Sequence, residues 1–170
     1  MAIQPPYAQA ILDGTKLVEF RKRRLAADID TVLVYESAPT KRIVGHFTIE
    51  RTESGTPQDL WRTFGSVGCI AREDYLAYYA QSERAVGLVV KHVERYEYPV
   101  ALAELRDHPA VPQSFSYLPF SALAEARALQ LPDPGWIDRA LGLVSGTAET
   151  CWGSSRPSFF RDSVSALIRR

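Results

Sequence analysis

The stretch GTKLVEFRKR, residues 14–23, decides how the first part of this chain is organised. From residue 17 onward it alternates as a β-strand does, and in a strand the side chains two positions apart lie on one face. Val18 and Phe20 form an apolar face, which we assign to the core. The other face carries three charged residues: Glu19, Arg21 and Arg23. We expect this charged side to point outward, and the spacing leaves open whether it meets solvent or lines a cleft.

Before this strand, the sequence predicts a short strand, a helix and a glycine stop. Residues 2–4 read as a strand, and the two prolines at 5 and 6 suit the first turn of a helix that runs to Leu12. Gly14 stands where a helix C-cap requires a positive φ angle. Further strands are expected over residues 31–36, 42–53 and 84–98 (one or two strands), and helices over 57–64 and 71–81.

The order of these elements indicates an α+β fold. The strands do not alternate regularly with long helices, which argues against a doubly wound parallel sheet. A small, mostly antiparallel β-barrel with short helices over its mouth fits better, and Gly45 marks a bulge or a close backbone approach. After Pro99, prolines separate further helices, expected over 120–129, 136–144 and 158–168. This C-terminal part should pack on the barrel, because four large aromatic residues there need burial: Trp136, Trp152, Phe159 and Phe160.

Composition limits the classes of partner. The 170 residues suit one domain with an appendage, and 20 Lys and Arg balance 20 Asp and Glu. Any affinity for nucleic acid must therefore come from a local patch. The strongest local cluster of positive charge is a set of five residues that could form a basic rim or simply a solvated turn: Lys22, Arg23, Arg24, Lys41 and Arg42.

Other features exclude several kinds of site. The two cysteines, Cys69 and Cys151, form neither a disulfide framework nor a metal knuckle, so we expect a reducing, cytoplasmic location. The three histidines (His46, His92 and His108) are scattered, and there is no glycine-rich phosphate loop, so we expect no metal, no cofactor and no NTPase activity. The N-terminus is not a secretory signal, and no apolar run approaches the roughly 20 residues that a membrane span needs.

The pattern PPYAQAILDGTKLVEFRKR, residues 5–23, resembles the signature of ASCH domains, a branch of the PUA-like superfamily. Four residues match its Gly-x-Lys-x-x-Glu-x-Arg motif: Gly14, Lys16, Glu19 and Arg21. The similarity continues through residues 34–50, 60–79 and 112–119. We therefore expect an ASCH domain over 1–119 and a helical extension over 120–170.

This resemblance implies a PUA-like β-barrel with a cleft beside the motif, and such clefts receive RNA, nucleosides or modified bases. The expected partner is RNA, another single-stranded nucleic acid or a nucleotide. Lys16 would supply positive charge for phosphate, or a general base if desolvation lowers its pKa. Glu19 would accept hydrogen bonds from a base, and Arg21 would fork onto phosphate or carbonyl oxygens. The alternative is a solvated Lys16 beside an ordinary surface ion pair.

Further residues are expected near the cleft. Ser37 and Thr40 flank the turn at Pro39, as turn formers or as ligand contacts. In the closing segment PQSFSYLP, three residues should border the cleft: Ser114, Phe115 and Tyr117. Arg23 and Lys41 of the basic cluster would contact phosphates. Three tyrosines recur at helical spacing, as core or, alternatively, as a stacking platform: Tyr75, Tyr78 and Tyr79.

The resemblance also raises the question of catalysis. Amidohydrolase relatives use a lysine, a threonine three residues further on, and a glutamate ahead of a helix. This chain keeps Lys16 but has Glu19 at the threonine position, no carboxylate in the segment SVGC (66–69), and Thr15 adjacent to the lysine. We therefore favour binding, with a ribonuclease or nucleoside amidohydrolase that uses Lys16, Glu19 and Arg21 as the alternative. A protein-interaction module that uses the C-terminal helices is the third reading.

Overall fold

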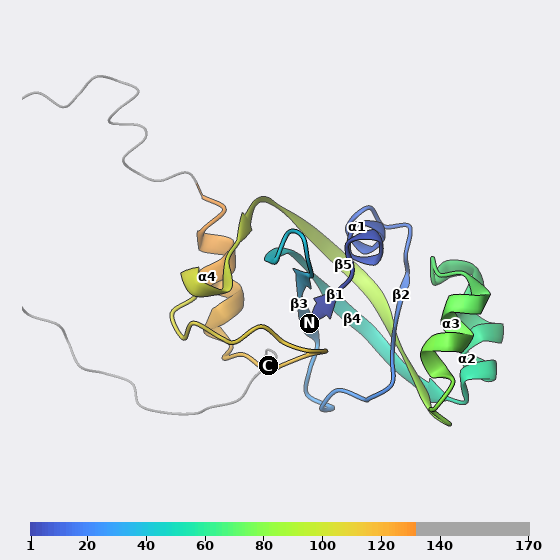
Figure 1. Cartoon of the computed structure of the whole chain (residues 1–170). Helices are drawn as coiled ribbons and strands as arrows, with labels where there is room; N and C mark the ends of the chain where they lie inside the picture. The colour runs from blue at the N-terminus through green and yellow to red at the C-terminus, as the bar shows by residue number, and fades with distance from the viewer. Residues whose placement is uncertain (132–170) are drawn as a thin grey trace, which may run out of the picture.

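The structure is a computed structural model that describes residues 1–131 (Figure 1). The expected helices over 136–144 and 158–168, their four aromatic residues and Cys151 lie outside the described residues. The elements, in chain order, are β1 (Ala2–Ile3), α1 (Pro5–Leu12), β2 (Val18–Arg21), β3 (Thr31–Glu36), β4 (Arg42–Gly55), α2 (Pro57–Phe64), the 3₁₀ turn η1 (Gly65–Val67), α3 (Arg72–Tyr79), β5 (Ala85–Val100), the 3₁₀ turn η2 (Leu102–Glu104) and α4 (Ser121–Ala128).

The strands form one mixed sheet in the order β1-β3-β4-β5-β2. Only the β1/β3 pair is parallel, and the other three pairs are antiparallel. The α+β class predicted from the sequence is therefore confirmed. A closed barrel would require β1 to pair with β2, and no such pairing is found within residues 1–131. Closure stays a prediction.

Local signals explain the helices that the sequence predicted. Thr56 caps α2, because its side chain accepts a hydrogen bond from the Asp59 backbone N–H at 3.1 Å, and Pro57 occupies the first turn. The helix covers residues 57–64, as predicted. After α1, Gly14 has φ +73°, the positive angle that its position predicts.

The strands follow the prediction except in their lengths. The region expected to form one or two strands over residues 84–98 forms the single 16-residue strand β5, Ala85–Val100. The strand β2 is only four residues long, so Leu17 and residues 22–23 lie outside it. Gly45 meets both of its expectations, because the β4–β5 register shifts beside it and an added Cβ atom would lie 2.4 Å from the Glu94 carbonyl oxygen.

The helices lie at different places on the sheet, as Figure 1 shows: α4 at one end of the long β4–β5 pair and α2 and α3 at the other. Alternate residues of β3 face opposite sides. Val32 and Val34 pack in the same cluster as α1, whereas Leu33 and Tyr35 pack in the cluster of α4. The described start of the C-terminal extension thus packs on the sheet, while the boundary at residue 119 stays a prediction.

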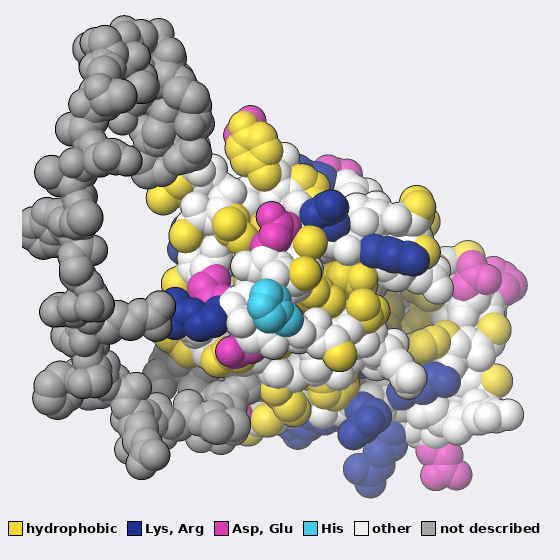
Figure 2. Space-filling model, turned by 60° about the vertical axis from the view of Figure 1, so that its left-hand side comes forward, with side chains coloured by type: hydrophobic (Ala, Val, Ile, Leu, Met, Phe, Trp, Pro, Cys, Tyr) yellow, Lys and Arg dark blue, Asp and Glu magenta, His cyan; other side chains and the backbone are white. Residues whose placement is uncertain are grey.

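Two further properties concern the charges on the surface and the length and polarity of the helices. Figure 2 shows a face on which Lys and Arg side chains are interspersed with Asp and Glu, with several Lys and Arg side chains gathered at its lower edge. Within residues 1–131, no helix has both the length and the apolar character that crossing a bilayer demands.

Candidate functional site

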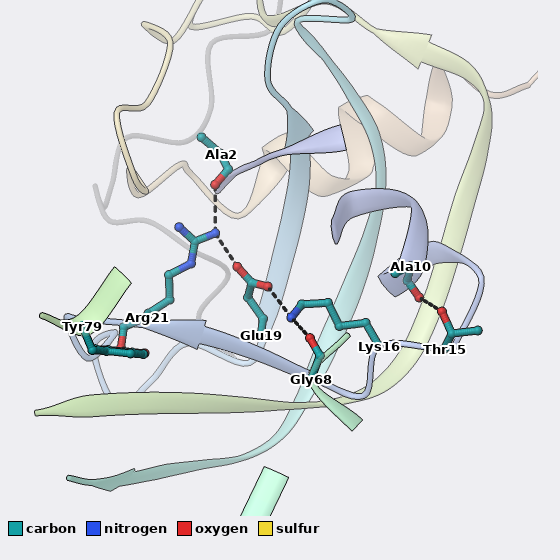
Figure 3. A network of polar contacts seen from close by, with 8 residues as sticks. All are labelled: Ala2, Ala10, Thr15, Lys16, Glu19, Arg21, Gly68 and Tyr79. Atoms are coloured by element: carbon teal, nitrogen blue, oxygen red, sulfur yellow. Dashed lines mark hydrogen bonds and ion pairs between the residues drawn. The ribbon is translucent and has the colours of Figure 1, made fainter. Parts of the chain in front are cut away.

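The charged residues around β2 form a continuous line of polar contacts (Figure 3). Lys16 Nζ lies 3.6 Å from Glu19 Oε2, and Arg21 Nη2 lies 2.7 Å from Glu19 Oε1. At one end of the line, Lys16 Nζ donates a hydrogen bond to the Gly68 carbonyl oxygen. At the other end, Arg21 Nη2 donates to the Ala2 carbonyl oxygen at 2.8 Å, so its side chain joins β2 to β1.

Of the two alternatives for this charged side, open solvent is excluded for Glu19 and Arg21, whereas Arg23 is exposed. Lys16, Glu19 and Arg21 are only 2%, 6% and 8% exposed. Segments distant in sequence contact β2 and the segment just before it: the Gly68 carbonyl oxygen accepts from Lys16, and the Tyr79 hydroxyl donates to the backbone carbonyl oxygen of Arg21 at 2.9 Å. Alternation identifies which residues share a face but not what later segments fold over it.

The three residues nevertheless open onto a cleft of about 260 Å³ between the end strands β1 and β2. Its lining combines the polar line with apolar and aromatic side chains: Ala2, Ile3, Gln4, Tyr7, Lys16, Glu19, Phe20, Arg21, Ser37, Ile70, Tyr78 and Gln113. Pockets for drug-sized ligands typically measure about 300–1,000 Å³. The cleft therefore suits a ligand no larger than a single base or nucleoside.

Burial and charge shape the chemistry of Lys16. Desolvation lowers the pKa of Lys16, and the nearby Glu19 carboxylate opposes that shift only in part. The Tyr7 and Phe20 rings lie 5.3 and 5.2 Å from Nζ, measured to their centroids. Lys16 is therefore held in a partly apolar setting, where it gives up its proton more readily than an ordinary lysine.

Arg21 is only partly satisfied. Its Nη2 atom makes the contacts with Glu19 and Ala2, but its Nε atom is buried without a hydrogen-bond partner in the structure. Buried polar groups are nearly always paired, and an unpaired donor costs about 1–3 kcal/mol. With Lys16 charged, the line holds two cations and one anion, so the cleft keeps a net positive charge for a ligand.

Of the residues predicted to bind a ligand, the structure brings four to the cleft: Lys16, Glu19, Arg21 and Ser37. The other four predicted residues do not line it: Arg23, Lys41, Ser114 and Tyr117. Lys41 is exposed with φ +51° in the turn before β4. Ser114 contacts β1 through its backbone, because its carbonyl oxygen accepts a hydrogen bond from the Ala2 N–H at 2.8 Å.

The remaining two residues of that set lie against other segments. The Tyr117 hydroxyl accepts a hydrogen bond from the Ala26 N–H at 3.0 Å. The Arg23 guanidinium is exposed and lies 5.7 Å from the centroid of the Phe115 ring. The similarity of a segment to the family pattern therefore does not show which of its side chains line the cleft.

The tyrosines of α3 separate into two roles. Tyr75 and Tyr79 are core residues, 0% and 3% exposed, and their hydroxyls donate to the carbonyl oxygens of Pro57 and Arg21. Tyr78 is 38% exposed and lines the cleft. The helical stripe alone could not separate the tyrosine at the cleft from its two core neighbours.

Sequence reasoning missed five cleft residues that carry side-chain chemistry: Gln4, Tyr7, Phe20 as a cleft wall, Ile70 and Gln113. Tyr7 lies within the helix predicted to run to Leu12, and Phe20 is assigned to the core by its place on the apolar face of the strand. No local signal distinguishes a buried aromatic side chain from one that also walls a cleft. The proximity of residue 70 to residue 16 depends on a long-range contact, which the sequence pattern does not specify.

Two other expectations concern chemistry at the site. The Thr15 hydroxyl donates to the Ala10 carbonyl oxygen at 3.0 Å and is turned away from the polar line (Figure 3). Within residues 1–131, no cluster of three His, Cys, Asp or Glu side chains is suited to a metal ion.

Comparison with known proteins identifies a family and several similar proteins. The ASCH domain family model matches residues 1–97. Large ribosomal subunit protein uL22 of Ureaplasma parvum is 34% identical over 119 residues, which cover 69% of this chain and 38% of that protein. The ASCH domain-containing ribonuclease of Zymomonas mobilis is 28% identical over 122 residues, which cover 69% of this chain and 82% of that protein.

A solved structure agrees with the fold. The crystal structure of ASCH from Zymomonas mobilis has a TM-score of 0.70 to this chain at 26% identity, covering 76% of this chain and 92% of the other. By contrast, this chain spans only 38% of the length of uL22.

Proposed function

Because the chain belongs to the ASCH domain family, we propose that it binds single-stranded RNA or a nucleotide in the cleft between β1 and β2. One observation carries this proposal: the line Lys16–Glu19–Arg21 and the aromatic residues Tyr7 and Tyr78 border the same small cleft. The similarity to a protein named a ribonuclease supports RNA as the ligand.

The lining matches the chemistry of an unpaired base. A base stacks on aromatic side chains and hydrogen-bonds through its edges. Tyr7, Phe20 and Tyr78 supply rings. Glu19 already contacts two cations, but a carboxylate has about four lone-pair positions and can still accept from a base amino group. Unused donors of Arg21 would meet a carbonyl or phosphate oxygen.

The size of the cleft favours single strands. A volume of about 260 Å³ cannot take a stacked base pair. Bases inside a duplex are stacked and paired, and extracting one costs a few kcal/mol. An unpaired base enters without this cost, so the proposal predicts a preference for single-stranded over double-stranded RNA.

The test compares the affinities of wild type, Lys16→Ala and Arg21→Ala for a labelled single-stranded RNA and for its duplex. Hydrogen bonds to charged groups contribute about 1.5–3 kcal/mol, so each cleft variant should lose on the order of 10- to 100-fold in affinity. Lys91→Ala, which removes an exposed cation outside the cleft, is the matched control. Equal affinities of all variants, or no binding of any nucleic acid by wild type, would overturn the proposal.

A second candidate, RNA cleavage, is favoured by the lowered pKa of Lys16. A neutral Lys16 could accept the proton of a 2′-hydroxyl, whose oxygen then attacks the adjacent phosphorus and displaces the 5′-oxygen. The products are a 2′,3′-cyclic phosphate and a 5′-hydroxyl, whose proton comes from the Lys16 ammonium or from water. Arg21 would stabilise the charge that develops on the phosphoryl oxygens. Hydrolysis of an acylated nucleoside has less support, because the Thr15 hydroxyl is directed at Ala10 rather than into the line.

Turnover separates the two candidates. If the chain cleaves RNA, Lys16→Ala abolishes product formation, and Glu19→Gln lowers kcat more than it lowers affinity. The wild-type rate should also rise with pH as Lys16 loses its proton, with a midpoint below that of an ordinary lysine. If the chain only binds, purified wild type gives no turnover and both variants change affinity alone.

A further inference from the structure

Two consecutive cations at the end of β2 rest on aromatic rings beside the cleft. Lys22 Nζ lies 4.7 Å from the centroid of the Tyr78 ring, and Tyr78 lines the cleft. Arg23 lies 5.7 Å from the Phe115 ring, two residues beyond Gln113, which also lines the cleft. Although adjacent in sequence, the two side chains therefore lean on different walls, α3 and the segment around 113–115.

These cations keep their charge available. Both residues are exposed, and the ion pairs identified among residues 1–131 involve neither of them. Arg42, from the same predicted basic cluster, instead lies 3.5 Å from the Glu104 carboxylate. An aromatic ring restrains a cation without neutralising it. Lys22 and Arg23 are thus positioned charges, whereas Arg42 is a paired one.

Their place in the chain sets Lys22 and Arg23 directly after a residue of the cleft. Arg21 lines the cleft, and Lys22 and Arg23 follow it at about 3.8 Å per residue along the backbone. In a nucleotide, only the sugar separates the base from its phosphates. A base that lies in the cleft with its sugar toward the end of β2 would therefore present its phosphates near these two side chains.

We propose that Lys22 and Arg23 form a phosphate ledge, which holds the backbone phosphate of the nucleotide whose base occupies the cleft. This inference rests on the proposed function and narrows its ligand to phosphate-bearing nucleotides, above all within a single strand, over free nucleosides and bases. Phosphate contacts position a strand without reading its sequence. The ledge therefore contributes affinity and salt dependence, and the cleft contributes the choice of base.

The experiment uses Lys22→Gln and Arg23→Gln, which remove charge but keep a long side chain. Matched controls are Lys91→Gln and Arg106→Gln, which remove the same charges outside the cleft. Affinities for a nucleoside and for its monophosphate are measured by competition with a labelled single-stranded RNA. The salt dependence of RNA binding is measured for every variant in the full-length chain.

Each ledge variant should lower the slope of log affinity against log salt by about one, and the controls should not. The preference of wild type for the monophosphate over the nucleoside should shrink in both ledge variants, while nucleoside affinity stays unchanged. Ledge variants that behave like the controls, or that lose nucleoside and monophosphate affinity equally, would overturn the ledge. In either case, RNA binding that is still weakened by Lys16→Ala would uphold the cleft as the binding site. Absence of all binding by wild type would overturn both.

Discussion

Two buried glutamates, Glu36 on β3 and Glu19 on β2, are held in different ways. Glu36 is 4% exposed, and its two carboxylate oxygens accept hydrogen bonds from the Gln9 amide and the Thr40 hydroxyl. Glu19 is 6% exposed, and its two oxygens contact the cations Arg21 and Lys16. Glu36 does not line the cleft, whereas Glu19 does.

The difference separates a structural carboxylate from a candidate functional one. Neutral donors from α1 and from the turn after β3 satisfy Glu36, and the Gln9 amide is itself bonded to Arg95 at 2.7 Å. The Glu19 group is less complete, because Arg21 keeps an unpaired buried Nε and Lys16 has a lowered pKa. Groups that folding leaves incompletely satisfied are the ones that a ligand can complete.

The largest expected effect comes from Glu19→Ala, which leaves two buried cations without their anion. Breaking a buried ion pair from one side costs about 3–5 kcal/mol, so the free energy of unfolding should fall by that amount. Chemical denaturation monitored by circular dichroism measures it. Glu19→Gln, which keeps the shape and one acceptor oxygen, is the control and should lose less. A loss as small as that of a surface variant would show that Glu19 does not hold the cations.

Glu36→Ala should have a smaller effect on stability and leave the cleft intact. The substitution removes the acceptor for the Gln9 amide and the Thr40 hydroxyl, which costs about 1–3 kcal/mol. Affinity for single-stranded RNA should stay near the wild-type value, because Glu36 is outside the lining. Denaturation and RNA binding are measured on the same preparation. A fall in affinity to match that of Lys16→Ala, in a folded variant, would contradict the structural role.

Tyr79→Phe tests what holds the backbone of β2 in place beside the Glu19 group. It removes the buried hydrogen bond to the Arg21 carbonyl oxygen and should lower stability by about 1 kcal/mol. Tyr78→Phe, at a partly exposed position, is the matched control and should change stability less. Thermal or chemical denaturation compares the two. Equal losses would indicate that the Tyr79 hydroxyl does not help to fix β2.

The smallest expected effect is on the pH dependence of stability in Lys16→Met. Because burial lowers the pKa of Lys16, the unfolded chain binds more protons than the folded one just below the pKa of an ordinary lysine. Stability of wild type should therefore rise with pH as the pH approaches the pKa of an ordinary lysine from below, and Lys16→Met should flatten this rise. Denaturation at a series of pH values gives the slope, with Lys91→Met as control. A slope that Lys16→Met leaves unchanged would show that Lys16 has an ordinary pKa.

Prediction from sequence succeeded where the deciding contacts are local. The bounds of α2 follow from Thr56 and Pro57, and the end of α1 follows from Gly14, all within a few residues of the helix. The motif placed Lys16, Glu19 and Arg21 together because two of them are neighbours on one strand face. These predictions needed no knowledge of the rest of the fold.

The covering of that face could not be predicted in the same way. The long-range contacts at this site join the Lys16 side chain to Gly68 and the Arg21 backbone to Tyr79, separations of 52 and 58 residues. Glu36 was not singled out at all, because its partner Gln9 is 27 residues away. Alternation records which residues share a face, but long-range packing decides whether that face meets solvent, a cleft or another element.

The edge of β1 that faces β2 has a consequence for how the sheet can open. The Ala2 N–H donates to the Ser114 carbonyl oxygen, and the Ala2 carbonyl oxygen accepts from Arg21. The end strands are therefore joined by one arginine side chain instead of a ladder of backbone hydrogen bonds. Releasing that contact costs about 1.5–3 kcal/mol, the contribution of a single hydrogen bond to a charged group. Because Arg21 also lines the cleft, a ligand that binds Arg21 competes with the contact that joins the two end strands.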